Sequence, residues 1–163
     1  MSLEEAVLED LEWDVLENVV PENITPENAE NIAEIWVKNA NDELLLIQRH
    51  PSQRHALQWE CPGGPFLPYE EPLEAAQRQL FEESGLRSSQ EELVYLGEIE
   101  QAGYHIYSYL YHITDPNVIL HLLPNEAIEA RYIDVEIVDH IEEEIIPTVW
   151  SRFLLYSDKI ISL

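Results

Sequence analysis

The segment from Gly64 to Leu86 constrains the fold of this chain most, because it sets glycines, carboxylates and an arginine at definite spacings. The preceding run Cys61-Pro62-Gly63-Gly64 ends an extended stretch, since glycine turns sharply at no steric cost. Pro72 suits the first turn of a helix, where its missing N–H is not needed. Ser84-Gly85 then supplies a helix C-terminus. The segment therefore predicts a loop that leads into a helix.

The predicted helix buries an apolar stripe and carries acidic side chains beside it. Leu73, Ala76 and Leu80 recur at helical spacing and predict the buried face. Positions three and four apart are neighbours on a helix, so Gln79 faces both carboxylates of Glu82-Glu83.

The Glu82-Glu83 pair is a candidate cation site. Adjacent carboxylates near a helix C-terminus repel each other and the helix dipole, and a bound cation would relieve both penalties. Mg²⁺ takes oxygen ligands and keeps several waters, so a few carboxylates and substrate phosphates can complete its shell. The alternative is a solvated acidic face, because Glu-Glu pairs occur at several other places in this acidic chain.

The spacing resembles the signature of the Nudix family. The matching positions are Gly64, Glu70, Arg78, Leu80, Glu82, Glu83, Gly85 and Leu86. The resemblance implies an α/β fold, a Nudix-type α/β/α sandwich with a mixed β-sheet. It also implies a metal-dependent hydrolase of a diphosphate bond in a nucleoside diphosphate derivative or similar organic diphosphate, with Mg²⁺ or Mn²⁺ as cofactor.

The resemblance also assigns roles to single residues. Glu82 and Glu83 are the implied metal ligands, and the backbone at Gly64 or its neighbour Gly63 can lend a carbonyl to the metal. Arg78 and Glu70 resemble supporting residues that orient the helix and its carboxylates.

Gln79 departs from the family pattern, which normally has a glutamate at this position. An amide cannot take a proton from water, and it adds no negative charge to a metal site. A replacement base is predicted at Glu126 or Glu129, for which the alternative is an ordinary exposed loop glutamate. The departure keeps a second function open, a catalytically weak or inactive Nudix-fold binding or regulatory module.

An isopentenyl-diphosphate isomerase, which shares the fold, is a third alternative. Those isomerases place a catalytic cysteine directly before the first glycine of the signature. This chain has Gly63 there and Cys61 two residues earlier, which disfavours the isomerase.

The charge of the chain restricts its partners. There are 33 acidic residues against 8 basic ones, a formal net charge of −25. Such a field repels nucleic acid and anionic membranes, so neither is an expected partner. It also repels a diphosphate, so a substrate would depend on metal ions and local cations. Arg49 and Arg54 flank the loop before the signature and are predicted substrate contacts, with surface charge balance as the alternative.

Length and composition predict one domain over residues 1–163, with an acidic N-terminal extension over 1–30. Hydrophobic residues make up 45% of the chain, enough for a proper core. The single cysteine suits a reducing compartment, and no apolar run is long enough to cross a membrane, so a cytoplasmic location is expected. Dimers are common in the family, so a homodimer is possible.

Periodicity and turn residues give the expected order of elements. A helix is expected over 3–20, with an edge strand near Trp13 as the alternative. Strands are expected over 33–37, 43–48, 59–61, 93–100, 104–113 and 130–133, and later helices over 136–144 and 148–160. Trp59 and Tyr104 are expected in the core, with stacking on a substrate base as the alternative. The six histidines show no metal-ligand spacing.

Overall fold

The computed structural model describes residues 30–53, 55–115, 120 and 127–162. The helix expected over 3–20 therefore lies outside the described residues, as does nearly all of the acidic extension. In the part of the chain that is described, no helix combines the length and the apolar character needed to cross a bilayer.

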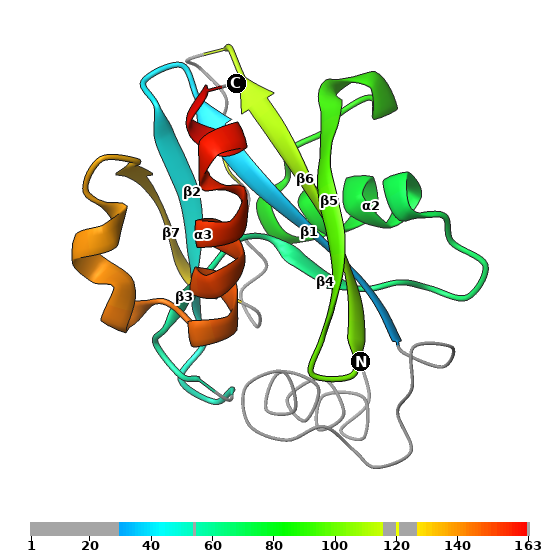
Figure 1. Cartoon of the computed structure of the whole chain (residues 1–163), viewed down its shortest axis with the longest axis horizontal. Coiled ribbons are helices and arrows are strands. Elements are labelled where there is room, and N and C mark those ends of the chain that lie inside the picture. The colour runs from blue at the N-terminus through cyan, green and yellow to red at the C-terminus, as the bar shows by residue number, and fades with distance from the viewer. Residues whose placement is uncertain (1–29, 54, 116–119, 121–126, 163) are drawn as a thin grey trace.

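Seven strands form one mixed sheet (Figure 1). The strands are β1 (Glu30–Asn39), β2 (Glu43–Arg49), β3 (Trp59–Glu60), β4 (Gly63–Pro65), β5 (Leu93–Gln101), β6 (Tyr104–Ile113) and β7 (Ala127–Asp134). The main path runs β3-β2-β1-β6-β5, while β4 pairs with β1 and β7 with β2. The β1–β6 pair is parallel and the other strand pairs are antiparallel, which confirms the predicted mixed sheet.

Two helices cover the two faces of the sheet, so the molecule is the expected α/β/α sandwich. Figure 1 shows α3 (Pro147–Ser162) in front of the sheet and α2 (Pro72–Ser84) behind it. Alternation along β1 follows this division, because successive strand residues point to opposite faces. Trp36 packs in the core with Phe153 of α3, whereas Ile35 packs in the core with Leu80 of α2.

Trp59 and Tyr104 belong to the core on the α3 side, as expected from the sequence. Their side chains are 7% and 8% exposed. This burial favours the packing role over stacking on a substrate base.

The structure differs from the sequence-based expectation at two places. Gly63–Pro65, expected as a turn, is a short strand that pairs with β1. Residues 136–144, expected as a regular helix, instead contain the 3-10 segment η2 (Val138–Glu144), which is interrupted at Ile141 with φ −116° and ψ 19°. The other strands and helices in the described residues lie where predicted: β3 is one residue shorter, β6 has the predicted bounds, and the rest extend one to several residues further. A second 3-10 turn, η1 (Gln90–Glu92), precedes β5.

Candidate active site

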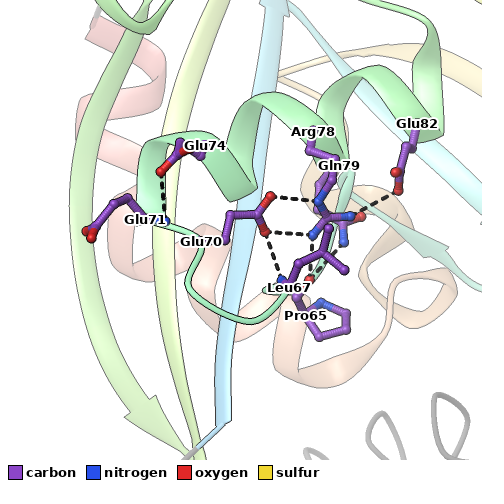
Figure 2. A network of polar contacts seen from close by, with 8 residues as sticks. All are labelled: Pro65, Leu67, Glu70, Glu71, Glu74, Arg78, Gln79 and Glu82. Atoms are coloured by element: carbon purple, nitrogen blue, oxygen red, sulfur yellow. Dashed lines mark hydrogen bonds and ion pairs between the residues drawn. The ribbon is translucent and has the colours of Figure 1, made fainter.

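Arg78 connects the loop before α2 to the acidic side of that helix (Figure 2). Its Nε and Nη2 donate to the two carboxylate oxygens of Glu70, at 2.8 and 3.0 Å, in a bidentate pair. The same Nη2 donates to the carbonyl of Pro65 at 2.8 Å, and Nη1 donates to Glu82 Oε2 at 3.0 Å. Glu70 in turn accepts from the backbone N–H of Leu67 at 2.9 Å. One guanidinium therefore fixes the loop, its glutamate and one helix carboxylate together.

The pairing with Arg78 changes the ionisation of Glu70. The hydrogen bonds from Arg78 lower the pKa of Glu70 from its usual value, more than partial burial raises it. The pKa of Arg78 is raised, chiefly by its hydrogen bonds to Glu70. Both groups are therefore held in their charged forms, and their predicted supporting role fits this geometry.

Helix α2 begins and ends as its sequence predicts. Pro72 occupies the first helical turn after Glu71, whose backbone N–H donates to the Glu74 carboxylate at 3.1 Å. Gly85 ends the helix with φ 78°, a left-handed conformation that glycine adopts without strain. These caps fix the length of the helix, and with it the position of the glutamates near its C-terminal end.

Gln79 lies on the inner side of α2, not beside solvent. Its side chain is 7% exposed, and its Nε2 donates to the Pro65 carbonyl at 3.2 Å. Gly64 makes this approach possible, because a Cβ there would lie 2.5 Å from Gln79 Nε2. The amide thus closes the loop onto the helix.

Glu82 and Glu83 lie at the C-terminal end of α2. The Glu82 side chain is 48% exposed and bound to Arg78, while Glu83 is half-buried. Within the described ranges, no group of three or more His, Cys, Asp or Glu side chains gathers closely enough to hold a metal ion.

Glu129 does not join the carboxylates of α2. It lies in β7, where Ala130 and Tyr132 pack against the α2-side core. Successive strand residues alternate between faces, so Glu129 and Arg131 point to the α3 side. There the Glu129 carboxylate pairs with Arg131 Nε at 2.8 Å, and the Arg131 guanidinium lies 5.7 Å from the Trp59 ring centroid. Glu126, the other predicted base, lies outside the described residues.

Arg49 is buried rather than exposed beside the loop. Its side chain is 3% exposed, and Nη1 lies 3.3 Å from a carboxylate oxygen of Glu60. The Arg49 side chain is therefore largely enclosed by the protein. Arg54 lies outside the described residues. The pairing of Glu60 with Arg49 was not predicted from the sequence. The signal for it was a charged residue between Trp59 and Cys61 in a short apolar strand.

A buried polar cluster on the α3 side was also missed. Glu34 of β1 accepts from Arg152 Nε at 2.9 Å and from Ser108 Oγ at 2.6 Å. The Cys61 thiol donates to the same carboxylate at 3.5 Å. Burial, with the nearby Glu34 charge, raises the pKa of Cys61 well above its ordinary value, which favours the protonated thiol over the nucleophilic thiolate. This also disfavours the isomerase alternative.

A mixed sheet between two helices, with an arginine-held loop leading into an acidic helix, defines an α/β/α sandwich of the MutT type. A MutT protein from Methanosarcina mazei Go1 shares this fold, with a TM-score of 0.62 and 21% identity over 82% of this chain and 96% of that one. A bifunctional NMN adenylyltransferase/ADP ribose pyrophosphatase from Francisella tularensis, solved with AMP and a Mn ion, also shares the fold. Its TM-score is 0.67 and its sequence identity 18%, over 97% of this chain and 48% of that one. The family described as the NUDIX domain matches residues 28–149, and the chain belongs to it.

A curated relative matches part of the chain. Diphosphoinositol polyphosphate phosphohydrolase 2 of Mus musculus is 35% identical over 74 residues, which are 45% of this chain and 40% of that protein. The match therefore spans well under half the length of the relative.

Proposed function

We propose that the protein is a metal-dependent hydrolase that breaks the diphosphate bond of a nucleoside diphosphate derivative or a similar organic diphosphate. Membership of the NUDIX family supports this reaction class. The observation that carries the assignment is the Arg78 network, which joins the loop, Glu70 and Glu82 by hydrogen bonds to one guanidinium. A fixed loop and fixed carboxylates are what positioning of a diphosphate requires.

The donor chemistry of the site fits a hard divalent cation such as Mg²⁺ or Mn²⁺. Glu82, Glu83 and the backbone carbonyl of Gly64 are oxygen donors, and they are the residues that would hold the ion. Mg²⁺ is often bound by one or two carboxylates plus substrate phosphates, with waters in the remaining positions. The small number of carboxylates in the described site is therefore compatible with it. When bound, such an ion neutralises phosphate charge and polarises the phosphoryl oxygen.

Hydrolysis adds the oxygen of a water molecule to one phosphorus and breaks its bond to the bridging oxygen. The leaving phosphate carries away the bond's electron pair, and the attacking water loses a proton to a base. Gln79 cannot accept that proton, because its amide nitrogen donates to the Pro65 carbonyl and an amide is not basic. Glu129 points to the opposite face of the sheet. The role of Glu126 as base stays a prediction.

One observation favours the second candidate function, a binding or regulatory module without turnover. Gln79 is buried and takes part in holding the loop, so the residue that replaces the family's glutamate serves packing. Such a protein would keep the metal and diphosphate site but leave the bound water unactivated.

Product formation from a panel of organic diphosphates, with Mg²⁺ or Mn²⁺ and with the products separated by ion-exchange chromatography, separates the two functions. The panel includes ADP-ribose and a diphosphoinositol, and the variants are Glu83→Ala and, as a matched exposed control, Glu91→Ala. Metal-dependent turnover that Glu83→Ala abolishes and Glu91→Ala preserves supports the hydrolase. Absence of turnover on every substrate by folded protein supports the binding module.

A cytoplasmic location, the absence of nucleic-acid and membrane partners, and a homodimer are part of the proposal. The location is supported by the single cysteine, and the partner preference by the net charge of −25. Light scattering of the purified protein would test the dimer.

A further inference from the structure

The positive charges of this protein are few, and nearly all can be located. Of the 8 basic residues in the chain, only Arg54 lies outside the described residues. The location of the other basic side chains decides how much negative charge a substrate can carry beyond the diphosphate itself.

Three of these cations are buried and held by protein groups. Lys38 is 1% exposed, and its Nζ donates to the carbonyls of Ile160 and Ile161 at 2.8 and 3.2 Å. Arg49 pairs with Glu60, and Arg152 with Glu34. Releasing any of them to a ligand would leave a buried partner unsatisfied, which is costly.

The site's own arginine is also committed. Arg78 donates hydrogen bonds to Glu70, Glu82 and the Pro65 carbonyl. It therefore positions the site, and its charge is already paired with protein carboxylates. Its charge is balanced by the two carboxylates that it binds.

The exposed cations in the described chain belong to three different segments. Arg87 follows α2 and lies over the Phe81 ring at 4.2 Å. Arg131 is in β7, paired with Glu129, and Lys159 is in α3, where its Nζ donates to the Leu96 carbonyl at 2.8 Å. These three described cations come from separate segments, each beside a different protein group, in a chain whose formal net charge is −25.

We infer that the substrate carries its negative charge at the diphosphate alone, joined to groups that are uncharged or cationic, and that polyphosphorylated diphosphates are rejected. This specificity rests on the proposed hydrolase function. A bound metal ion would neutralise the diphosphate, but each further phosphate would meet an acidic protein whose described residues offer cations only in separate segments. The chain thus differs from what the name of its diphosphoinositol polyphosphate relative indicates for that protein.

Two measurements test this specificity. The first is calorimetric titration of inositol hexakisphosphate into the protein with EDTA at low salt. Binding weaker than about 1 mM is expected, and micromolar binding would overturn the inference. The control is Glu142→Lys/Glu143→Lys/Glu144→Lys, which replaces three exposed carboxylates of η2 by a basic cluster and is expected to bind measurably tighter.

The second measurement compares kcat/KM for two compounds that each carry one diphosphate group on an inositol ring. In one compound the remaining ring positions are free hydroxyls, and in the other all the remaining positions carry phosphate. At low salt, kcat/KM for the fully phosphorylated compound is expected to be lower by a factor of about ten or more. The gap should narrow as salt shortens the screening length from roughly 30 to 8 Å. Equal or faster hydrolysis of the fully phosphorylated compound would refute the inference while leaving the hydrolase intact. If neither compound nor any other diphosphate is cut, the proposed function fails, and the titration alone decides the specificity.

Discussion

At the scale of single residues, Gln79 and Arg78 share one acceptor, the Pro65 carbonyl. Their side chains leave adjacent positions of α2 and meet over the loop, as Figure 2 shows. The amide is neutral, so it can approach the carbonyl without the repulsion that a carboxylate would meet. The departure from the family pattern is therefore compensated locally, which the sequence alone did not indicate.

Replacing Gln79 by glutamate should lower the stability of the metal-free protein and raise its affinity for a metal ion. Gln79→Glu loses the donor to Pro65 and leaves a buried carboxylate, which should lower the free energy of unfolding by about 1–3 kcal/mol in EDTA. Mg²⁺ should restore the melting temperature, and turnover should rise if the missing base limits it. Thermal melts with EDTA and with Mg²⁺ would show this. High wild-type activity that the substitution reduces would contradict it.

The Glu70–Arg78 pair should make stability depend on acid pH. The folded-state pKa of Glu70 lies below its unfolded value, so the pair's contribution is present above the unfolded pKa and is lost as pH falls through the folded pKa. Glu70→Gln should remove this part of the acid dependence. Urea unfolding from pH 7 down to about pH 3 would measure it, since Gln carries no titrating proton. Parallel pH profiles for the wild type and the variant would count against the pair.

At the scale of elements, β4 is a strand only because two glycines allow close approach on both faces. A Cβ at Gly63 would lie 2.7 Å from the backbone oxygen of Ala33 in β1. A Cβ at Gly64 would meet the Gln79 side chain of α2 instead. The turn propensity of glycine hid this strand from the sequence, since the pairing depends on neighbours distant in the chain.

Alanine at these two positions should have different effects. Gly63→Ala presses on backbone that cannot move cheaply, so we expect a loss of roughly 1–3 kcal/mol in unfolding free energy. Gly64→Ala presses on the end of a side chain, and Gln79→Ala should relieve it. Urea denaturation of the single and double variants measures the coupling, and additive losses for Gly64→Ala and Gln79→Ala would refute this packing.

Other elements were predictable to different degrees. The helix over the signature was fixed by its own caps, Pro72 and Gly85, and the long strands by their apolar runs. Residues 138–144 carry too few buried side chains for a regular helix, and only Val138 is fully buried there. Local propensity without burial favours a weak 3-10 segment.

At the scale of the whole molecule, buried charges fasten α3 to the sheet. Glu34 of β1 accepts from Arg152 of α3. Lys38, four residues further along β1 and on the same face of the strand, donates to carbonyls at the end of the same helix. The backbone of Glu34 also pairs with β4 through Gly63. One strand thus connects α3 on one face with the loop before α2 on the other.

Breaking this connection should be costly and non-additive. Arg152→Met leaves the Glu34 carboxylate buried without its cation, so about 3–5 kcal/mol of unfolding free energy should be lost. The double variant Glu34→Gln/Arg152→Met should lose less than Arg152→Met alone. Urea unfolding of Arg152→Met, Glu34→Gln and the double variant, each compared with the wild type, tests this. The exposed substitution Glu91→Ala is the control. A double variant that is less stable than the sum of its parts would be inconsistent with the pair.

The face to which a charged residue points was beyond the reach of the sequence. The spacing of the signature found the residues that the structure brings together, Glu70, Arg78 and Glu82. It could not show that Glu129 projects to the other side of the sheet, or that Arg49 is buried. Both outcomes depend on strand register, which long-range pairing sets.

Cys61 gives the protein an internal reporter of its own opening. It is the one thiol of the chain, it is fully enclosed, and it directly precedes the Pro62-Gly63 step into β4. A thiol reagent can therefore reach it only in molecules whose sheet has opened beside the active-site loop. The rate of labelling would measure how often that happens, and a ligand that closes the loop would slow it, whether or not the ligand is ever cut.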